Sequence, residues 1–380
     1  MLSPDLSPKE AWVTWAEVDL DALAHNVRQI RAFVGEKVQV IAVVKADAYG
    51  HGMVPVAQAA LRAGAARLAV HRVQEGIALR RAGIQAPILL LGYAPLAAVP
   101  QVVDYGLTPT VLTTDFVDAL HTQAPEGFPI HVKVDTGMGR FGLLPHEVVD
   151  FLRYVRRYAP KLRLEGLYTH FATADEADTT YLHHQWRAFQ EVMAQAQAAG
   201  FAFPLKHACN SAATFALPEA HLDAVRPGIA LYGMRPSLEW ETPVPLRPAL
   251  ALKSRVARVR VLPAGSSIGY GRTYRTDRPQ RVALVPVGYG DGYVRALSNK
   301  GYVLIRGKRC RILGRVSMDQ IVVDADPVPQ VGMEDEVVLI GAQGGDRITA
   351  EEVAAWAGTI NYEVTTLLQP RVPRFYRATR

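Results

Sequence analysis

Short apolar runs alternate with amphipathic stretches of helical spacing over residues 38–233, and this alternation constrains the fold more than any other feature. The first run, residues 38–44, is almost unbroken and rich in β-branched side chains, which is typical of a strand buried on both faces. It ends on Lys45, and a turn with two glycines then precedes a helical stretch that begins near Met53. A charged residue in that position is where α/β barrels carry their chemistry.

The candidate strands number eight over about 200 residues, which predicts an α/β fold with an N-terminal (β/α)8 barrel. They lie at residues 40–44, 68–70, 88–91, 108–112, 130–134, 164–169, 205–208 and 224–229. Amphipathic stretches between them, such as 73–81, 146–158 and 179–199, predict the helices of the barrel.

The pattern changes after Gly233. A proline-rich stretch at 235–248 reads as a linker, and mostly strand-like runs follow at 252–262, 281–287, 302–305, 321–323 and 336–340. One late helix is expected near 350–356, and the opening residues 15–20 also read as a strand. We therefore predict a barrel over residues 21–240 and a second, mainly β domain over 241–380.

The composition sets limits on function. With 49% hydrophobic and 21% charged residues and no long apolar run, we expect a soluble protein that does not cross a membrane. The formal charge of +6 is scattered, without interleaved aromatic residues, so we expect no nucleic-acid binding. Two separated cysteines, Cys209 and Cys310, and the lack of a basic-then-apolar leader favour a cytoplasmic location without a signal peptide.

Residues 43–52, Val-Val-Lys-Ala-Asp-Ala-Tyr-Gly-His-Gly, resemble the pyridoxal-phosphate lysine signature of the alanine racemase family. Further blocks of the family follow in the same order, which makes the resemblance specific. These blocks are residues 133–140, 168–175, 210–213, 225–233, 269–274, 288–292, 317–320 and 360–363. In this family the first strand joins the C-terminal β domain, so residues 1–20 are expected to pair there.

The resemblance implies that Lys45 carries pyridoxal 5'-phosphate as a Schiff base, which suits a lysine whose apolar surroundings favour the neutral amine. The other residues that match cofactor-binding positions of the family are Tyr49, Leu91, His170, Asn210, Ser211, Arg226, Gly228, Ile229 and Tyr362. From the residues alone, Ser211 is also a candidate helix N-cap and Gly228 a candidate turn residue with positive φ.

Racemisation requires one base on each face of the substrate Cα. By resemblance these catalytic bases are Lys45 and Tyr270, the latter supplied by the partner subunit of a homodimer with shared active sites. Arg226 matches the arginine that faces the pyridine nitrogen, and His170 matches a neighbour of the tyrosine base. Taken alone, a histidine such as His170 is more often structural than functional.

Substrate-binding positions of the family match Arg140, Tyr289, Met318 and Asp319. Lys133 matches a lysine that many members carry as a carbamate, which would convert a cation into an anion able to pair with Arg140. Ser317 stands where many relatives have cysteine, and His71-Arg72 stands where relatives have smaller or apolar residues.

The resemblance implies an alanine racemase that interconverts L- and D-alanine and supplies D-alanine for peptidoglycan. It implies no metal. The alternatives are a broader-specificity amino-acid racemase, a pyridoxal-phosphate decarboxylase of the same fold, and a non-catalytic pyridoxal-phosphate-binding protein. Tyr270 and the block at 317–320 argue against the decarboxylase, and the β domain argues against the single-barrel binding protein.

Overall fold

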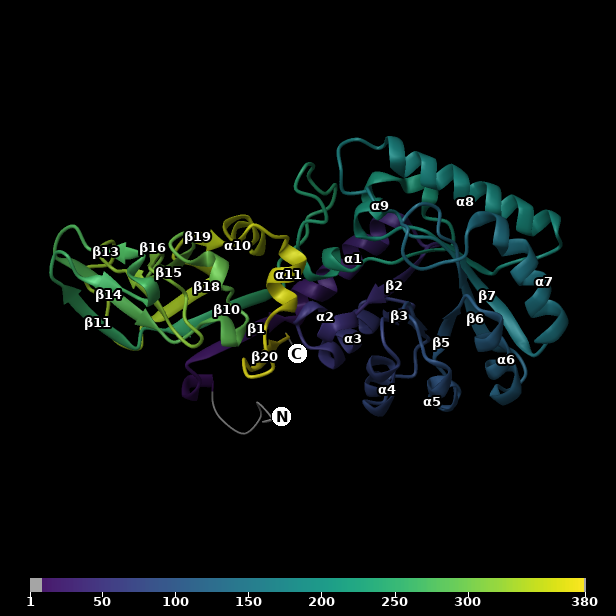
Figure 1. Cartoon of the computed structure of the whole chain (residues 1–380), viewed down its shortest axis with the longest axis horizontal. Coiled ribbons are helices and arrows are strands. Elements are labelled where there is room, and N and C mark those ends of the chain that lie inside the picture. The colour runs from purple at the N-terminus through teal and green to yellow at the C-terminus, as the bar shows by residue number, and fades with distance from the viewer. Residues whose placement is uncertain (1–8, 379–380) are drawn as a thin grey trace. The chain divides into compact units, whose positions relative to one another are not determined.

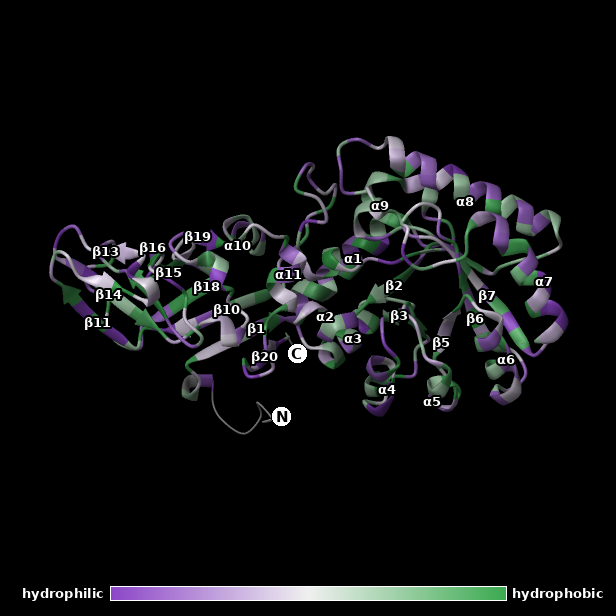
Figure 2. Cartoon of the chain, viewed as in Figure 1, coloured by the Kyte–Doolittle hydropathy of each residue, from purple (hydrophilic) through white to green (hydrophobic). Residues whose placement is uncertain are grey.

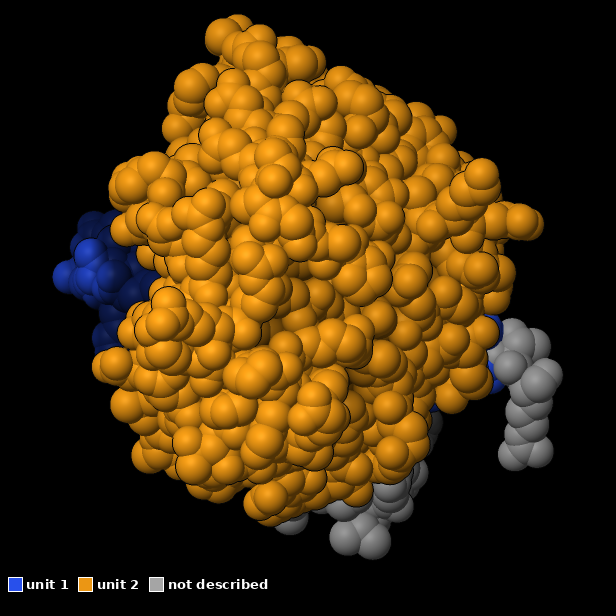
Figure 3. Space-filling model, turned by 90° about the vertical axis from the view of Figure 1, so that its right-hand side faces the viewer, with its two compact units in different colours: residues 1–21, 49–52, 248–380 blue, residues 22–48, 53–247 orange. Residues whose placement is uncertain are grey.

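The computed structural model describes residues 9–378. Residues 1–8 and 379–380, the outer ends of the predicted first and last segments, lie outside the described residues. The chain divides into two compact units, which Figure 3 shows in different colours. The barrel unit contains residues 22–48 and 53–247, and the β unit contains the described residues up to 21, residues 49–52, and those from 248 onward.

Eight parallel strands close the barrel, which confirms the predicted fold class. In order around the barrel they are β2 (Gln39–Val43), β3 (Arg67–Val70), β4 (Ile88–Leu90), β5 (Thr108–Val111), β6 (Phe128–Lys133), β7 (Leu162–Tyr168), β8 (Leu205–His207) and β9 (Ala224–Val225). The ring closes where Val40 of β2 pairs with Val225 of β9. The interior residues of these strands are almost fully buried, as the continuous apolar runs indicate.

Helices cover the outside of the barrel, as Figure 1 shows. They are α1 (Leu20–Val34), α3 (Met53–Arg62), α4 (Val73–Arg81), α5 (Val99–Asp104), α6 (Thr114–Gln123), α7 (Val148–Tyr158), α8 (Thr180–Ala198) and α9 (Ser211–Ala216). The longest, α8, buries Leu182, Trp186 and Phe189 along one face, and Figure 2 shows hydrophilic and hydrophobic residues interspersed along it. This spacing of three and four residues explains why sequence periodicity located the helices.

The prediction for the last barrel strand was wrong at its carboxyl end. We expected a strand through Ile229, but β9 stops at Val225, and Ile229–Tyr232 forms a 3-10 helix, η6. Pro227 lies between them and has no N–H to donate to a neighbouring strand. The Arg226 N–H still donates to Cys209 and the Pro227 carbonyl still accepts from Val43, so the chain leaves the sheet after Pro227, with Arg226 at the barrel mouth.

The β unit is built on one large sheet. Its order is β11-β14-β17-β16-β15-β18-β10-β1-β20, with β19 paired to β18, and β12 pairs with β13 apart from it. The bounds are β1 (Thr14–Asp19), β10 (Leu250–Arg255), β11 (Arg258–Leu262), β12 (Ser267–Ile268), β13 (Tyr274–Arg275), β14 (Gln280–Val285), β15 (Tyr302–Ile305), β16 (Lys308–Leu313), β17 (Ile321–Asp324), β18 (Glu336–Gln343), β19 (Asp346–Ile348) and β20 (Arg374–Arg377). Strand β1 pairs antiparallel with β10 and parallel with β20, so the first and last strands of the described residues share this sheet.

Two details of the β unit differ from expectation. The single strand expected at 252–262 is two strands, because Val256 and Ala257 donate to Asp335 and Leu284 and the chain changes partners there. Beside the predicted late helix, now α10 (Ala350–Ala357), a further helix α11 (Asn361–Thr366) follows Gly358, whose φ of 74° ends α10. The six residues of α11 are too few to show an apolar periodicity.

Within the described residues, no helix has the length and apolar character needed to cross a membrane.

Candidate functional site

Lys45 follows β2 at the carboxyl end of the barrel and begins a left-handed turn, α2 (Lys45–Tyr49). The φ angles of Ala46, Asp47, Ala48 and Tyr49 are 53°, 52°, 53° and 54°. For residues with a Cβ atom this conformation costs roughly 1–2 kcal/mol each, so it persists only where surrounding contacts enforce it. Strain of this kind directly after a lysine at a barrel mouth indicates a functional turn.

The carboxylate of Glu75, near the start of α4, holds this turn in place by hydrogen bonds. Its Oε1 accepts the N–H of Ala46 at 2.7 Å, while its Oε2 accepts the N–H groups of His71 and Arg72 at 2.8 and 2.9 Å. Through Glu75, the backbone N–H groups of His71 and Arg72 connect the loop after β3 to the turn that follows Lys45. These hydrogen bonds involve the backbone of His71 and Arg72 and not their side chains. Sequence reasoning missed Glu75, although its place three residues after Arg72 is the spacing of a helix capping residue.

The Lys45 amine is held in a form suited to nucleophilic attack. Burial lowers its pKa, the positive charges of Arg140 and Arg226 lower it further, and only Glu75 opposes them. A larger fraction of the amine is therefore neutral at neutral pH than for a solvated lysine.

Arg226 is buried at the barrel mouth, with 3% of its surface exposed, and is not a surface ion pair. Its NH1 donates to Nδ1 of His207 at 2.6 Å, and its NH2 donates to the carbonyl oxygens of Thr169 and Ala208 at 2.7 and 3.0 Å. NH2 also lies 3.3 Å from Nδ1 of His170. Burial lowers the pKa of Arg226 to about 10, which still leaves the guanidinium charged at neutral pH. Among the described residues no hydrogen bond uses Nε, so this donor is available to a bound group.

A set of donors lies where β8 and β9 end. Ser211 Oγ accepts the N–H groups of Gly228 and Ala230 at 2.8 and 3.3 Å, which joins the starts of α9 and η6. Asn210, not Ser211, is the N-cap of α9, and its Oδ1 accepts from Ala213. Gly228 has a φ of −116°, so a left-handed turn does not explain this glycine. The Ser211 oxygen accepts these two bonds, and its own O–H can donate to an anion such as a phosphate.

Two further cations border Lys45 and Arg226. Lys133 is the last residue of β6, and burial followed by the charges of Arg226 and Arg140 lowers its pKa to about 8. Arg140 lies on the loop after β6, which Asp135 holds by accepting the N–H groups of Gly137, Gly139 and Arg140 at 2.8–3.0 Å. The barrel mouth therefore concentrates positive charge, as a site for a phosphate and a carboxylate requires.

Two other predicted residues have simpler surroundings. Leu91 follows β4 and is partly buried, and its N–H donates to Val70 at 2.9 Å. Burial and the charge of Arg226 hold the pKa of His170 well below its usual value, so the ring is neutral at neutral pH.

Tyr49 and Tyr362 belong to the β unit, where their rings lie 6.2 Å apart. Burial raises the pKa of Tyr49, so its hydroxyl stays protonated as a donor. The backbone beside it packs against α11: a Cβ at Gly50, whose φ is +83°, would lie 2.0 Å from the carbonyl oxygen of Thr365. Only glycine fits there, which explains the first glycine of the signature.

The β unit contains three of the four expected substrate-binding residues, Tyr289, Met318 and Asp319. The N–H groups of Tyr289 and Gly290 donate to the carbonyl oxygens of Ser317 and Met318 at 3.1 and 2.8 Å, which joins the block at 288–292 to that at 317–320. Arg371, which sequence reasoning missed, donates to Asp291 and Asp319, each at 2.6 Å.

Three of these side chains are exposed in the single chain: Tyr270 at 72%, Met318 at 53% and Tyr289 at 42%. Large side chains that are exposed in a single chain are available to contact a partner.

The described part of the chain holds no group of three or more His, Cys, Asp or Glu side chains placed to bind a metal ion.

Comparison with known proteins identifies the family of both units. Residues 18–236 match the model of the alanine racemase N-terminal domain, and residues 249–376 match that of the alanine racemase C-terminal domain. The alanine racemase of Symbiobacterium thermophilum is 47% identical over 96% of this chain and 97% of its own, and that of Halothermothrix orenii is 44% identical over 96% and 97%. The crystal structure of alanine racemase from Bacillus anthracis with bound L-Ala-P superposes with a TM-score of 0.92 at 42% identity, covering 98% of this chain and 96% of that one.

Proposed function

This chain belongs to the alanine racemase family, and we propose that it interconverts L- and D-alanine with pyridoxal phosphate attached to Lys45. The observation that carries the assignment is the Lys45 amine, held in an enforced left-handed turn with a lowered pKa beside buried cations. The broader-specificity racemase and the decarboxylase become outcomes of the test below.

The residues present suit this cofactor. When bound, pyridoxal phosphate withdraws electrons from the substrate Cα and makes its proton removable. In the barrel unit, Ser211 offers a hydroxyl for the phosphate beside Gly228 and Ile229 at the start of η6. Tyr49 and Tyr362 match phosphate-binding positions of the family and each carry a hydroxyl.

Arg226 would face the pyridine nitrogen with its free Nε–H. A guanidinium can only donate, so Arg226 would keep that nitrogen unprotonated. A ring nitrogen without a positive charge would be a weaker electron sink, which would limit side reactions that need a stronger one.

We assign the two bases to different chains. Lys45 holds and returns the Cα proton on the face used by D-alanine, and Tyr270 of a second copy does so on the face used by L-alanine. The exposure of Tyr270, Met318 and Tyr289 supports a homodimer in which these side chains complete the partner's site.

Arg140 would bind the substrate carboxylate, because its loop is held at the barrel mouth by Asp135. Lys133 is a candidate for carbamylation, since an amine with a pKa of about 8 is partly neutral and able to react with carbon dioxide. The resulting anion would pair with Arg140.

The product D-alanine supplies peptidoglycan synthesis in this proposal. The cytoplasm is the assigned compartment, in keeping with two free, buried cysteines, Cys209 and Cys310.

The test is incubation of the cofactor-loaded protein with L-alanine and chiral detection of D-alanine, with serine and lysine in parallel and Lys45→Ala as the control. We expect D-alanine only with intact Lys45, and borohydride reduction should attach the cofactor to Lys45 in peptide mass spectra. Release of carbon dioxide would identify a decarboxylase, and equal racemisation of serine or lysine would identify a broad-specificity enzyme. An adduct on another lysine would refute the assignment of Lys45.

A further inference from the structure

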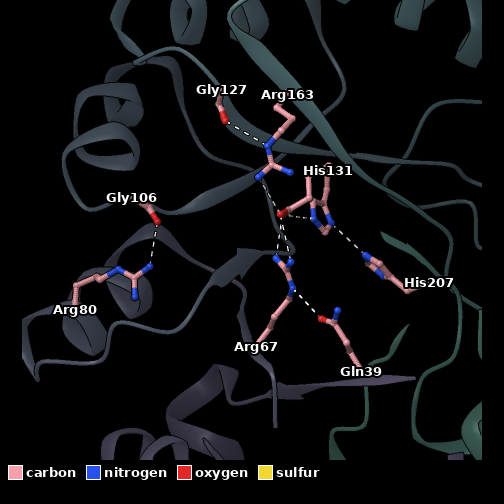
Figure 4. A network of polar contacts seen from close by, with 9 residues as sticks. Gln39, Arg67, Arg80, Gly106, Gly127, His131, Arg163 and His207 are labelled. Carbon is pink, nitrogen blue, oxygen red and sulfur yellow. Dashed lines mark hydrogen bonds and ion pairs between the residues drawn. The ribbon is translucent and has the colours of Figure 1, made fainter. Parts of the chain in front are cut away.

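A line of polar side chains runs through the interior of the barrel, where apolar residues normally fill the space. His131 of β6, Glu165 of β7 and His207 of β8 are buried, with exposed fractions of 1%, 6% and 0%. Figure 4 shows the imidazoles of His131 and His207 facing each other, with the guanidinium groups of Arg67 and Arg163 near His131. The proposed reaction gives none of the three a role.

The line ends on Arg226. Oε2 of Glu165 lies 3.1 Å from Nε2 of His131, and Nδ1 of His131 lies 3.1 Å from Nε2 of His207. Nδ1 of His207 then lies 2.6 Å from NH1 of Arg226. We call Glu165, His131 and His207 the Glu165 relay.

The far end of the relay is an ionised carboxylate. Arg67 donates to both oxygens of Glu165, at 3.0 and 3.3 Å, and Arg163 donates to Oε1 at 3.1 Å. Burial alone would raise the pKa of Glu165, but the hydrogen bond from His131 and the charge of Arg67 lower it to about 2. Glu165 is therefore only an acceptor at neutral pH.

The two ends determine the protonation of both imidazoles. Because a guanidinium only donates, Nδ1 of His207 must be a bare acceptor, and its proton lies on Nε2. His207 then donates to His131, whose Nδ1 must also be bare and whose Nε2–H donates to Glu165. Only this arrangement gives each of the three contacts one donor and one acceptor, and all three hydrogen bonds then run in one direction, from Arg226 to Glu165.

The packing holds the two rings in place. Gly166 pairs with His131 across β6 and β7, and a Cβ at Gly166 would lie 2.4 Å from Nδ1 of that ring. The His207 ring stacks on Tyr168 with centroids 4.7 Å apart and 17° between planes, and the same tyrosine lies 5.0 Å from the Arg226 guanidinium. The rings therefore present their nitrogens in fixed directions.

We propose that Glu165, His131 and His207 are positioning residues that fix the orientation of the Arg226 guanidinium through a one-way chain of hydrogen bonds. The inference rests on the proposed function, in which Arg226 faces the cofactor ring. Because NH1 and NH2 of Arg226 are both held by hydrogen bonds, the direction of its Nε–H bond is fixed as well.

The charges around the relay agree with neutral imidazoles. Burial lowers the pKa of His131 and His207, and the cations Arg67 and Arg226 lower both further, while Glu165 opposes them only at His131. Tyr168, the other titratable group in contact, is protonated because burial raises its pKa to about 12.

A pair of variants separates a hydrogen-bond role from packing. His131→Leu removes every acceptor for His207, whereas His131→Asn keeps an amide oxygen that can accept from its Nε2–H. We expect His131→Leu to lower kcat about tenfold or more with KM for alanine little changed, since the relay touches no substrate, and His131→Asn to recover most of kcat. The control is Arg163→Gln, because the Arg163 side chain is half exposed and bonds Glu165 on the side away from His131. This variant should leave kcat unchanged. Equal loss in the Leu and Asn variants would overturn the proposal.

The protonation pattern is tested independently of racemisation. In the full chain labelled with 15N-histidine, with and without pyridoxal phosphate, solid-state 15N spectra report which ring nitrogen carries a proton, and the His131 and His207 variants assign the signals. We expect both rings neutral and protonated on Nε2. A proton on Nδ1 of either ring, or a cationic ring at neutral pH, would refute the relay. A protein that racemised no alanine would refute the proposed function alone, because the 15N spectra would still decide the relay.

Discussion

Replacing Glu165 by glutamine should destabilise the barrel in a way that depends on pH. The carboxylate is ionised in the folded state because its pKa is lowered from 4.5 to about 2. Folding lowers the pKa, so ionised Glu165 stabilises the fold above pH 4.5, and this stabilisation is lost as the pH falls towards 2. The variant removes the charge at every pH, so it should differ from the parent only where Glu165 is ionised.

The expected change in the free energy of unfolding follows from the size of the pKa shift of Glu165. A change of about 2.5 pKa units corresponds to about 3 kcal/mol at pH 7. The Glu165 side chain is only 8% exposed, but its partners Arg67 and Arg163 are 18% and 48% exposed, and solvent screens part of the attraction. We therefore expect Glu165→Gln to lower the free energy of unfolding by about 2 kcal/mol at pH 7 and by less than half of that at pH 3.

The assay is urea unfolding of the cofactor-free protein at pH 7, 5 and 3, with parent and variant at equal protein concentration. Asp150→Asn is the matched control, because Asp150 of α7 is 81% exposed and its ion pair with Arg153 lies at the surface. That variant should stay within about 0.5 kcal/mol of the parent at each pH. A Glu165→Gln effect that persisted unchanged at pH 3 would show that packing of the amide, not charge, is responsible.

Three further predictions test the bases, the shared site and the barrel interior. Tyr270→Phe should abolish racemisation while the protein retains its cofactor, and should slow deuterium exchange at Cα of L-alanine far more than of D-alanine; equal slowing of both would contradict the assigned faces. Lys45→Ala and Tyr270→Ala dimers should each be nearly inactive, but refolding them together should restore roughly one quarter of parental activity per subunit, since about half of the dimers carry one intact site. Verified mixed dimers without activity would place both bases in one chain. Gly166→Ala should lower the free energy of unfolding by about 1–3 kcal/mol in urea titrations, because the new methyl group displaces the His131 ring; an unchanged midpoint would show that the ring moves freely.

The alternation of apolar runs predicted the barrel because each strand is buried on both faces. A strand buried on both faces needs apolar residues at successive positions, and these are visible in the sequence. The same reasoning placed Lys45 at a strand end, and the family blocks identified the candidate residues around it. It failed at β9, where Pro227 ends the ladder, and at α11, which is too short to show a period. The local sequence pattern indicates which residues are buried, but it does not indicate which distant residues they contact.

Only the tertiary structure decided how these residues are held. The left-handed turn after Lys45 is unfavourable for alanine and aspartate by themselves, and it depends on Glu75, thirty residues further on. The relay to Arg226 requires side chains from β6, β7 and β8 to meet inside a closed barrel, at distances set by strand register. Hydrogen-bond direction and imidazole protonation arise from such distant neighbours, so no reading of local sequence could have supplied them.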